Sequence, residues 1–266
     1  MKKKHVKRIL FLIASLFILS ACNIGVSNPN ADQPGAGTSE PAPTPHTASG
    51  GLCDNILFPI KQGASWTYLN TGSPSGDFTY TDTITELRTD GFTLTSQFTG
   101  LTRTQEWQCT PEGLKALQLG GAGSAANIST QGTSAEFTTK EVTGISLPKE
   151  VTPGLQWTYS LTMEGFTAMP DNQMAQSTGT FNFTMQEMGR ETITVPAGTF
   201  EAVKFQSTSL VQIIADFQGI QVPVTINGSS TIWYAPGVGF IKSIENSDYG
   251  GAPFTSTTEL QSYSIP

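Results

Sequence analysis

The sequence is poor in the residues that most catalytic and metal sites use. Only two of its 266 residues are histidine, His5 and His46, so residues 51–266 contain none. A Ser-His-Asp triad, a Cys-His pair and a histidine-ligated metal site are therefore excluded there. The three cysteines form no metal-binding cluster, and no Asp-x-Asp-x-Asp-Gly run for calcium occurs. We accordingly expect no metal and no cofactor.

Basic residues are also scarce once the N-terminus is set aside. Five of the 14 Lys and Arg residues lie in the first 21 positions, which contain no Asp or Glu. The rest of the chain carries nine basic and 21 acidic side chains, a formal charge of −12. Such an acidic surface repels phosphate backbones, so we do not expect nucleic acid as a partner.

No apolar run is long enough to cross a bilayer as a helix. The run Ile9–Leu19 has 11 residues, whereas a spanning helix needs about 20. It follows a basic stretch and ends in the sequence LSAC at Cys22, the pattern of a bacterial lipobox. We interpret residues 1–21 as a lipoprotein signal peptide and Cys22 as the lipidated first residue after cleavage. An ordinary signal peptide followed by a chance cysteine is the alternative.

Lipid chains such as palmitate on Cys22 would anchor the protein to the cell membrane or outer membrane, on the extracytoplasmic face. The stretch that follows, residues 22–50, is dominated by Pro, Gly, Ser, Thr, Ala and Asn, and its only large aliphatic residues are Ile24 and Val26. Such a composition cannot bury enough surface to offset the entropy of ordering. We therefore expect a disordered, lipid-anchored linker.

Alternation of apolar and polar residues dominates the rest of the chain. Residues 155–164 and 180–186 place apolar and polar side chains on opposite parities, and Phe78, Tyr80 and Ile84 alternate with threonines. This pattern is typical of antiparallel strands with one buried face, and no convincing helical periodicity competes with it. It predicts strands over residues 65–71, 77–88, 91–98, 102–109, 114–119, 134–142, 155–164, 178–188, 190–196, 200–215, 220–234, 238–246 and 254–264.

A tryptophan signature occurs twice. Gly63–Tyr68 reads GASWTY and Gly154–Tyr159 reads GLQWTY, while Trp107 and Trp233 each stand six residues before a Gly that is followed by Leu or Phe. Trp suits a half-buried strand whose ring N–H reaches a partner, so core positions are favoured over ligand stacking. The repeat indicates two pseudo-equivalent halves.

We divide the folded region at this repeat into two β half-repeats, residues 51–144 and 145–266. The expected fold class is all-β. Its sheet is antiparallel and strongly curved, or forms an open or half barrel, built from the two pseudo-repeated halves.

Three segments carry a family resemblance. They are FPIKQGASWTY (Phe58–Tyr68), ETITVPAGTFEAV (Glu191–Val203) and WYAPGVGFIK (Trp233–Lys242). In this order they resemble the TapB-like group of bacterial envelope proteins, over most of residues 53–245. The resemblance implies an all-β, extracytoplasmic, often lipid-anchored domain of unknown function. It carries over no catalytic residue.

Two cysteines, Cys53 and Cys109, remain once Cys22 is lipidated. In an exported domain we expect them to form a disulfide, which would close a loop of 57 residues. The chain-entropy model gives such a bond about 4 kcal/mol. Two free, buried thiols are the alternative.

The most apolar stretch of the mature chain is residues 211–226. It is interpreted either as an extra hairpin that lines an apolar cavity or as an ordinary buried hairpin. Pro223 cannot donate to a ladder, which favours an edge strand or a bulge there. The candidate surface for an apolar ligand or a partner consists of Val211, Ile213, Ile214, Phe217, Ile220, Val222 and Val224.

These observations leave three functional hypotheses. The first is a non-catalytic binding or scaffold module for an apolar ligand or an envelope protein, and it agrees best with the missing histidines. The second is a carboxylate-based hydrolase of cell-wall or extracellular glycans. Glu187 and Glu191, or Glu201 and Asp216, are the acid pairs considered for it, but nothing in their spacing selects them, and solvated charges at strand edges are the favoured interpretation. The third is a purely structural surface protein. Two carboxylates facing one cleft would favour the hydrolase, whereas an apolar concavity without paired acids would favour the binder.

Overall fold

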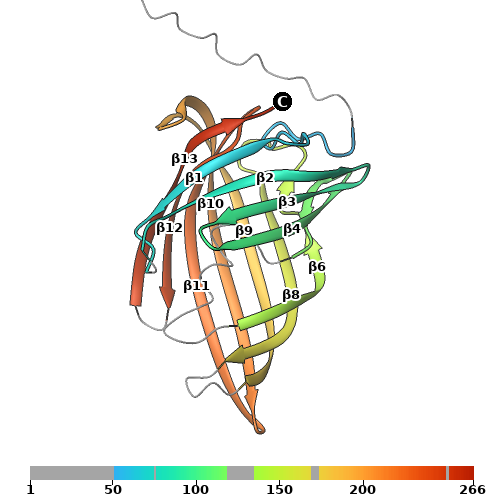
Figure 1. The fold of residues 1–266 in the computed structure, drawn as a ribbon, viewed down its shortest axis with the longest axis vertical. Helices are drawn as coiled ribbons and strands as arrows, with labels where there is room; N and C mark the ends of the chain where they lie inside the picture. The colour runs from blue at the N-terminus through green and yellow to red at the C-terminus, as the bar shows by residue number, and fades with distance from the viewer. Residues whose placement is uncertain (1–50, 75, 119–134, 169–173, 250–251) are drawn as a thin grey trace, which may run out of the picture. The chain divides into compact units, whose positions relative to one another are not determined.

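The computed structural model describes residues 51–74, 76–118, 135–168, 174–249 and 252–266 (Figure 1). Every regular element in these residues is a β-strand. The same residues include no helix long and apolar enough to cross a membrane. The all-β prediction is therefore confirmed.

Thirteen strands are present in the described residues, in the chain order β1 (Ser65–Thr71), β2 (Phe78–Arg88), β3 (Gly91–Phe98), β4 (Leu101–Thr110), β5 (Gly113–Ala116), β6 (Ala135–Gly144), β7 (Leu147–Pro148), β8 (Gln156–Ala168), β9 (Met174–Val195), β10 (Gly198–Phe217), β11 (Ile220–Ala235), β12 (Gly239–Tyr249) and β13 (Ala252–Ser264). Most lie within two residues of the ranges that alternation predicts. The hairpin of β10 and β11 is much longer than the average strand pair.

All thirteen strands belong to one antiparallel sheet with the order β6-β8-β9-β10-β11-β12-β13-β1-β2-β3-β4-β5-β7. The sheet curls, so that β1 to β4 lie in front of β8 to β10 in Figure 1. It does not close, because no ladder joins its two edge strands, β6 and β7. The prediction of a strongly curved, open antiparallel sheet is confirmed.

One short segment connects the two edges. β6 pairs with β8, and two residues later β7 pairs with β5. Between them, the backbone N–H of Ile145 donates to Thr158 O at 3.1 Å and that of Ser146 donates to Leu114 O at 2.9 Å. The two edges are therefore held together at this point by one continuous stretch of chain, which pairs first with β8 and then with β5.

Two differences from the expected strands have local causes. The ranges 178–188 and 190–196 form one strand, β9, rather than two. Two residues of β9, Met188 and Gly189, oppose a single residue of β10 there, and Gly189 has a φ of 107°. This is a glycine-containing β-bulge, which bends a strand without ending it. The two-residue strand β7 was not expected, because it is too short to show any alternation.

Inner-face residues pair directly across the first strands. Trp66, Tyr68 and Asn70 are buried on β1 and alternate with half-buried neighbours. Tyr68 pairs with Tyr80 of β2, and Asn70 pairs with Phe78. Because directly opposed residues share a face, aromatic rings of adjacent strands stack along the inside of the sheet.

Residues 52–60 cross one end of the curled sheet as an irregular strap. Cys53 forms a disulfide with Cys109 of β4, as expected from the sequence. Asn55 Nδ2 donates to Pro148 O of β7 at 2.9 Å. The strap is thus fastened to two neighbouring parts of the sheet.

The strap also reaches the opposite side of that end and fills it. The N–H of Gly237, in the β11–β12 turn, donates to Ile56 O at 2.7 Å. Phe58 stacks against Trp66 and Trp107, with ring centroids 5.4 and 6.0 Å apart. This end of the interior is therefore plugged by aromatic side chains.

The repeated Trp-Thr-Tyr segments begin β1 and β8. Trp66 is 1% exposed and its Nε1 donates to Val238 O, whereas Trp157 is half-buried and its Nε1 donates to Ser146 O. Both copies contribute to the core, as expected. Strand β6, from the first half-repeat, pairs with β8 of the second, and β7 of the second pairs with β5 of the first. The boundary at residue 144 remains a prediction about the repeat.

Reduction of the disulfide should destabilise the fold. The variant Cys53→Ser/Cys109→Ser should lose about 4 kcal/mol of unfolding free energy, because the unfolded chain regains the freedom of the closed loop. Urea unfolding with and without reductant measures this loss. The unmodified protein should become as unstable as the variant under reductant, and the variant should not respond. An unmodified protein insensitive to reductant would contradict the assignment.

Candidate functional site

A cavity of about 330 Å³ lies inside the curled sheet. Its volume is at the lower end of the range typical of small-molecule sites. Residues of β1 to β5, β7 to β13 and the strap contribute to its lining. The aromatic side chains of the lining are Phe58, Tyr68, Tyr80, Trp107, Tyr159, Phe181, Phe183, Tyr234 and Phe240.

One wall of the cavity is polar. It is formed by residues of β10 to β13, where polar side chains stand opposite each other in register: Ser207 pairs with Ser230, Ser230 with Glu245, and Ser243 with Thr258. The polar lining residues of these strands are Ser209, Ser229, Ser230, Ser243, Glu245 and Thr258. The cavity therefore combines an aromatic wall with a hydroxyl-rich one.

Asp82 is the carboxyl on the aromatic side. It lies on β2 between Tyr80 and Ile84, opposite Trp66 of β1 and Ser96 of β3. Ser96 Oγ donates to Asp82 Oδ1 at 2.5 Å. Burial raises the pKa of Asp82 to about 6, and the serine hydrogen bond only partly opposes this shift. The remaining exposure of Asp82 is explained by the cavity, which it lines.

Glu245 is the carboxyl on the polar wall. Ser247 Oγ, on the same strand, donates to Glu245 Oε1 at 2.9 Å. Burial raises the pKa of Glu245, and the serine hydrogen bond opposes the shift. Both cavity carboxyls are therefore poorly solvated and each is partly satisfied by one serine.

The two carboxyls do not form a glycosidase pair. Glu245 stands opposite Ser256, and Ser256 lies against Gly72, just beyond β1. Asp82 stands opposite Trp66, which precedes Gly72 by six residues. At the rise of a strand, six residues separate the two rows by about 20 Å. Neither charge is among the causes that shift the pKa of the other. The arrangement lacks the acid pair about 5–10 Å apart that glycoside hydrolysis requires.

Asp82 and Glu245 were not among the acids that the sequence singled out. For Asp82 a signal was available, because it shares the parity of Phe78, Tyr80 and Ile84 in an otherwise apolar row. An acid on the buried parity of a strand is unusual unless it has a partner or a function. The position of Glu245 depends on register across β11 to β13, which no local pattern reveals.

The first acid pair considered for a hydrolase, Glu187 and Glu191, has structural contacts. Glu187 is 7% exposed, and its two oxygens accept the backbone N–H groups of Gly154 and Gly189 at 2.7 and 2.9 Å. Glu191 Oε1 accepts the ring N–H of Trp233 at 2.7 Å. Neither residue lines the cavity.

The second pair considered, Glu201 and Asp216, also lies outside the cavity lining. Glu201 accepts a hydrogen bond from the hydroxyl of Thr192 on the neighbouring strand. Asp216 Oδ1 accepts the N–H of Gly219 and so stabilises the β10–β11 turn. Neither pair shares the cavity, which agrees with the favoured interpretation of these acids as structural charges.

The candidate apolar surface lies on the β10–β11 hairpin and does not line the cavity. Ile213 is buried, whereas Ile220 is 66% exposed. Strand β12 pairs with β11 only from Asn227 onward. The preceding part of β11 pairs with β10 on one edge and has no described strand on its other edge. The exposed members of the predicted set are Ile214, Ile220, Val222 and Val224. Their role as a ligand or partner surface remains a prediction.

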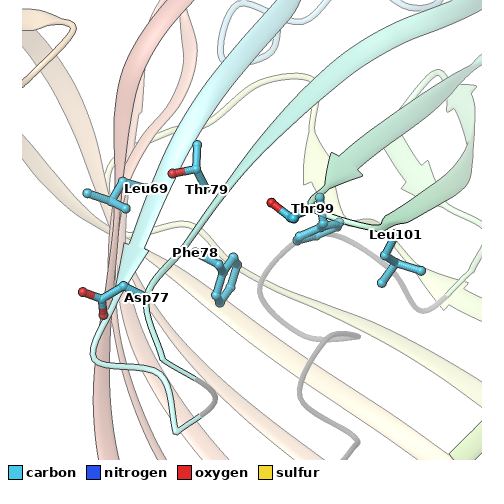
Figure 2. A pocket seen from close by; sticks show the side chains of 7 residues that line it. Leu69, Asp77, Phe78, Thr79, Thr99 and Leu101 are labelled. Atoms are coloured by element: carbon cyan, nitrogen blue, oxygen red, sulfur yellow. The ribbon is translucent and has the colours of Figure 1, made fainter.

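A larger hollow of about 510 Å³ lies near the β3–β4 turn and the start of β2 (Figure 2). Figure 2 shows Phe78, Thr99 and Leu101 around it. Leu101 is 44% exposed, and the carboxyl of Asp77 accepts the N–H of Gly72. The hollow is thus an open surface depression without converging polar groups, and the internal cavity is the better candidate site.

Residues 116–260, more than half of the chain, match the DUF3108-like family, and the protein belongs to it. The TapB-like name inferred from the sequence is not confirmed, although an uncharacterised family fits. No curated protein matches the sequence.

Three solved structures are similar in fold. One, from Bacteroides fragilis NCTC 9343, is described as an exported protein with a YmcC-like fold; it is 14% identical, with a TM-score of 0.50, over 79% of this chain and 100% of that one. A second, described as a lipoprotein of Parabacteroides distasonis ATCC 8503, is 16% identical, with a TM-score of 0.50, over 80% and 99%. The hypothetical lipoprotein YmcC of Escherichia coli is 12% identical over 76% and 85%, and its TM-score of 0.31 is too low to support an argument.

The raised pKa of Asp82 gives a stability prediction. Because the folded state binds the proton more tightly than the unfolded state, ionised Asp82 costs stability above about pH 6, and this cost disappears as the pH falls towards 4. Asp82→Asn should therefore stabilise the protein at pH 7.5 by at most about 3 kcal/mol. Urea unfolding at several pH values measures the difference.

Asp90→Asn, which removes an exposed carboxyl from the β2–β3 turn, is the matched control and should change stability little at any pH. The gain from Asp82→Asn should vanish below about pH 4, the ordinary pKa of an aspartate. A gain that is equal at both pH extremes would show that the effect does not come from the buried charge.

Proposed function

We propose that this protein is a membrane-anchored, extracytoplasmic lipoprotein that binds a mostly apolar, amphiphilic ligand in the cavity of its sheet, without catalysis. The observation that carries the proposal is the cavity itself, in which aromatic rings face a hydroxyl-rich wall. Ligand sites are typically concave, mostly apolar, and equipped with a few polar groups that orient the ligand. Each Å² of apolar ligand surface removed from water would contribute about 25 cal/mol.

The arrangement of the acids favours binding over hydrolysis. Asp82 and Glu245 lie in the same cavity but in rows of the sheet that are six residues apart. Each is held by a serine rather than by a second acid. A hydrolase of the type considered from the sequence would need two acids across one bond.

The proposed location is supported by the N-terminal sequence. A basic stretch, an 11-residue apolar run and a lipobox precede Cys22. Two proteins of similar fold are described as an exported protein and a lipoprotein. Cys22 itself lies outside the described residues.

A second candidate function, docking of an envelope protein, is favoured by the exposed apolar side chains of the β10–β11 hairpin. Ile220 is 66% exposed and Val224 is 43% exposed, although both belong to an otherwise well-paired hairpin. The side of β11 before Asn227 that no described strand occupies would accept an added strand.

Filling the cavity should abolish ligand binding. Ser209 lines the cavity and Thr208, next to it on β10, is exposed on the opposite face. Ser209→Trp should weaken binding of the neutral fluorescent probe N-phenyl-1-naphthylamine by at least about tenfold, and Thr208→Trp should not. Fluorescence titration measures both. Unchanged binding to a folded Ser209→Trp protein, or no binding to the unmodified one, would contradict the proposal.

The anchor should depend on Cys22. Cys22→Ser should prevent incorporation of radiolabelled palmitate, because only the thiol accepts the lipid group. Metabolic labelling followed by fractionation measures this. The matched variant Asn23→Ser keeps the lipobox cysteine and should still be labelled and recovered with membranes. Labelling that persists without Cys22 would contradict the proposed site.

A further inference from the structure

The cavity is unbalanced in charge. Its lining includes two carboxyls, Asp82 and Glu245, and no Lys or Arg among the described residues. The internal segments outside the description, residues 75, 119–134, 169–173 and 250–251, contain no Lys, Arg or His in their sequence. No basic side chain of the described lining, and none in those segments, is therefore available to neutralise the two carboxyls.

The basic residues of the described chain are engaged elsewhere or lie apart. None of the residues in the described ion pairs lines the cavity; these pairs are Arg88 with Glu86 and Glu106, Lys140 with Glu164, Lys204 with Glu191, and Lys242 with Glu259. Arg103 is the basic residue nearest to Asp82 in the register, because it stands opposite Ser96, which stands opposite Asp82. It is half-buried but forms no described ion pair and does not line the cavity.

Tyr80 is the neighbour of Asp82 on the cavity side of β2. It is 4% exposed, and it stands two residues from Asp82, which also lines the cavity. Burial and the charge of Asp82 raise the pKa of Tyr80, so the hydroxyl stays protonated and lies within the field of the carboxylate. A ligand group that lies beside Asp82 in the cavity would therefore also lie near this tyrosine.

We propose that the ligand of this cavity is an organic cation, an amphiphile whose protonated amine binds between the Asp82 carboxylate and the Tyr80 hydroxyl and whose apolar part packs against the aromatic wall. This inference rests on the proposed function, since it assigns the ligand class of the same cavity. The free oxygen of Asp82, Oδ2, accepts one ammonium N–H, and the Tyr80 oxygen accepts another. Ser96 continues to hold Oδ1.

The surroundings of Asp82 suit a cation better than an anion or a neutral head group. The rings of Tyr68 and Tyr80 lie 5.1 Å apart, and the Asp82 charge contributes to the raised pKa of both tyrosines. Aromatic faces attract cations electrostatically, and more strongly when water is excluded. A carboxylate that is already desolvated also forms a stronger ion pair than a solvated one.

The test compares three probes that share one alkyl chain: decylammonium, decanol and decanoate. The protein is the mature chain, residues 22–266, with Cys22→Ser, so that no attached lipid competes. Isothermal titration calorimetry at about pH 7 should give a dissociation constant for decylammonium about tenfold lower than for decanol, the expected value of a charge-assisted hydrogen bond. Decanoate should bind more weakly than either.

Variants locate the cation. Asp82→Asn should weaken decylammonium about tenfold and leave decanol unchanged, whereas Asp90→Asn should change neither. Tyr80→Phe, which keeps the ring but removes the hydroxyl, should weaken decylammonium more than decanol. A loss caused by Glu245→Gln instead of Asp82→Asn would overturn the assignment to Asp82. Thermal unfolding of each variant verifies that it is folded.

The affinity should also depend on pH with a defined sign. Decylammonium remains charged between pH 5 and 7, while Asp82 takes up a proton as the pH falls below about 6. Its binding should therefore weaken about tenfold from pH 7 to pH 5. The groups that face Asp82 are Tyr68, Tyr80 and Ser96, which stay neutral over this range, and Arg103, which stays charged. In the Asp82→Asn variant the dependence should be lost.

The outcomes separate this inference from the proposed function. Equal binding of decanol and decylammonium, or preference for decanoate, would overturn the cation assignment and leave an apolar ligand site intact. Failure of all three probes and of N-phenyl-1-naphthylamine to bind would overturn both.

Discussion

The structure depends on the burial of one sheet face without helices. Thirteen described strands present a long row of large apolar side chains, and no described helix covers them. The sheet solves this by curling, so that residues from distant strands meet in one cluster; Trp66, Phe92, Phe205, Ile241 and Leu260 are all fully or almost fully buried there. A barrel-like sheet with many strands is wider than its side chains can fill, and an internal cavity results.

Curling also explains the chemistry of the cavity. An inward-facing residue is enclosed from several strands at once, so a carboxyl on that face loses most of its water even though it is not tightly packed. Asp82 and Glu245 show this effect in their raised pKa values. Direct cross-strand pairs also place like residues next to each other: Ser207 with Ser230, Tyr234 with Phe240, and Tyr68 with Tyr80.

Most of the fold follows from local sequence. Alternation locates nearly every strand, since one buried face imposes a period of two wherever a strand is long enough. It fails at Gly189, where a bulge continues β9 through a change of parity that resembles an end. It also fails at β7, whose two residues pair only because the curl brings β5 beside them. The Cys53–Cys109 disulfide was predictable because the chain after Cys22 contains no other cysteines.

The site was harder to predict than the fold. Hydrophobicity alone drew attention to residues 211–226, but several of their apolar side chains are exposed on the hairpin and do not line the cavity. The lining depends on which residues of strands distant in sequence face one another, and that is decided by register and curl. Asp82 was identifiable by its parity, whereas Glu245 and the serine rows became meaningful only once β10 to β13 were aligned.

The short connection between the edge strands β6 and β7 affects how far the sheet can widen. In a closed barrel a continuous ladder fixes the circumference, and the barrel can widen only if that ladder breaks. Here β7 pairs with β5 through two residues, and a few nearby backbone hydrogen bonds join the two edges of the open sheet. The open sheet can therefore widen along this one line at little cost, while the ladders on either side of it stay intact.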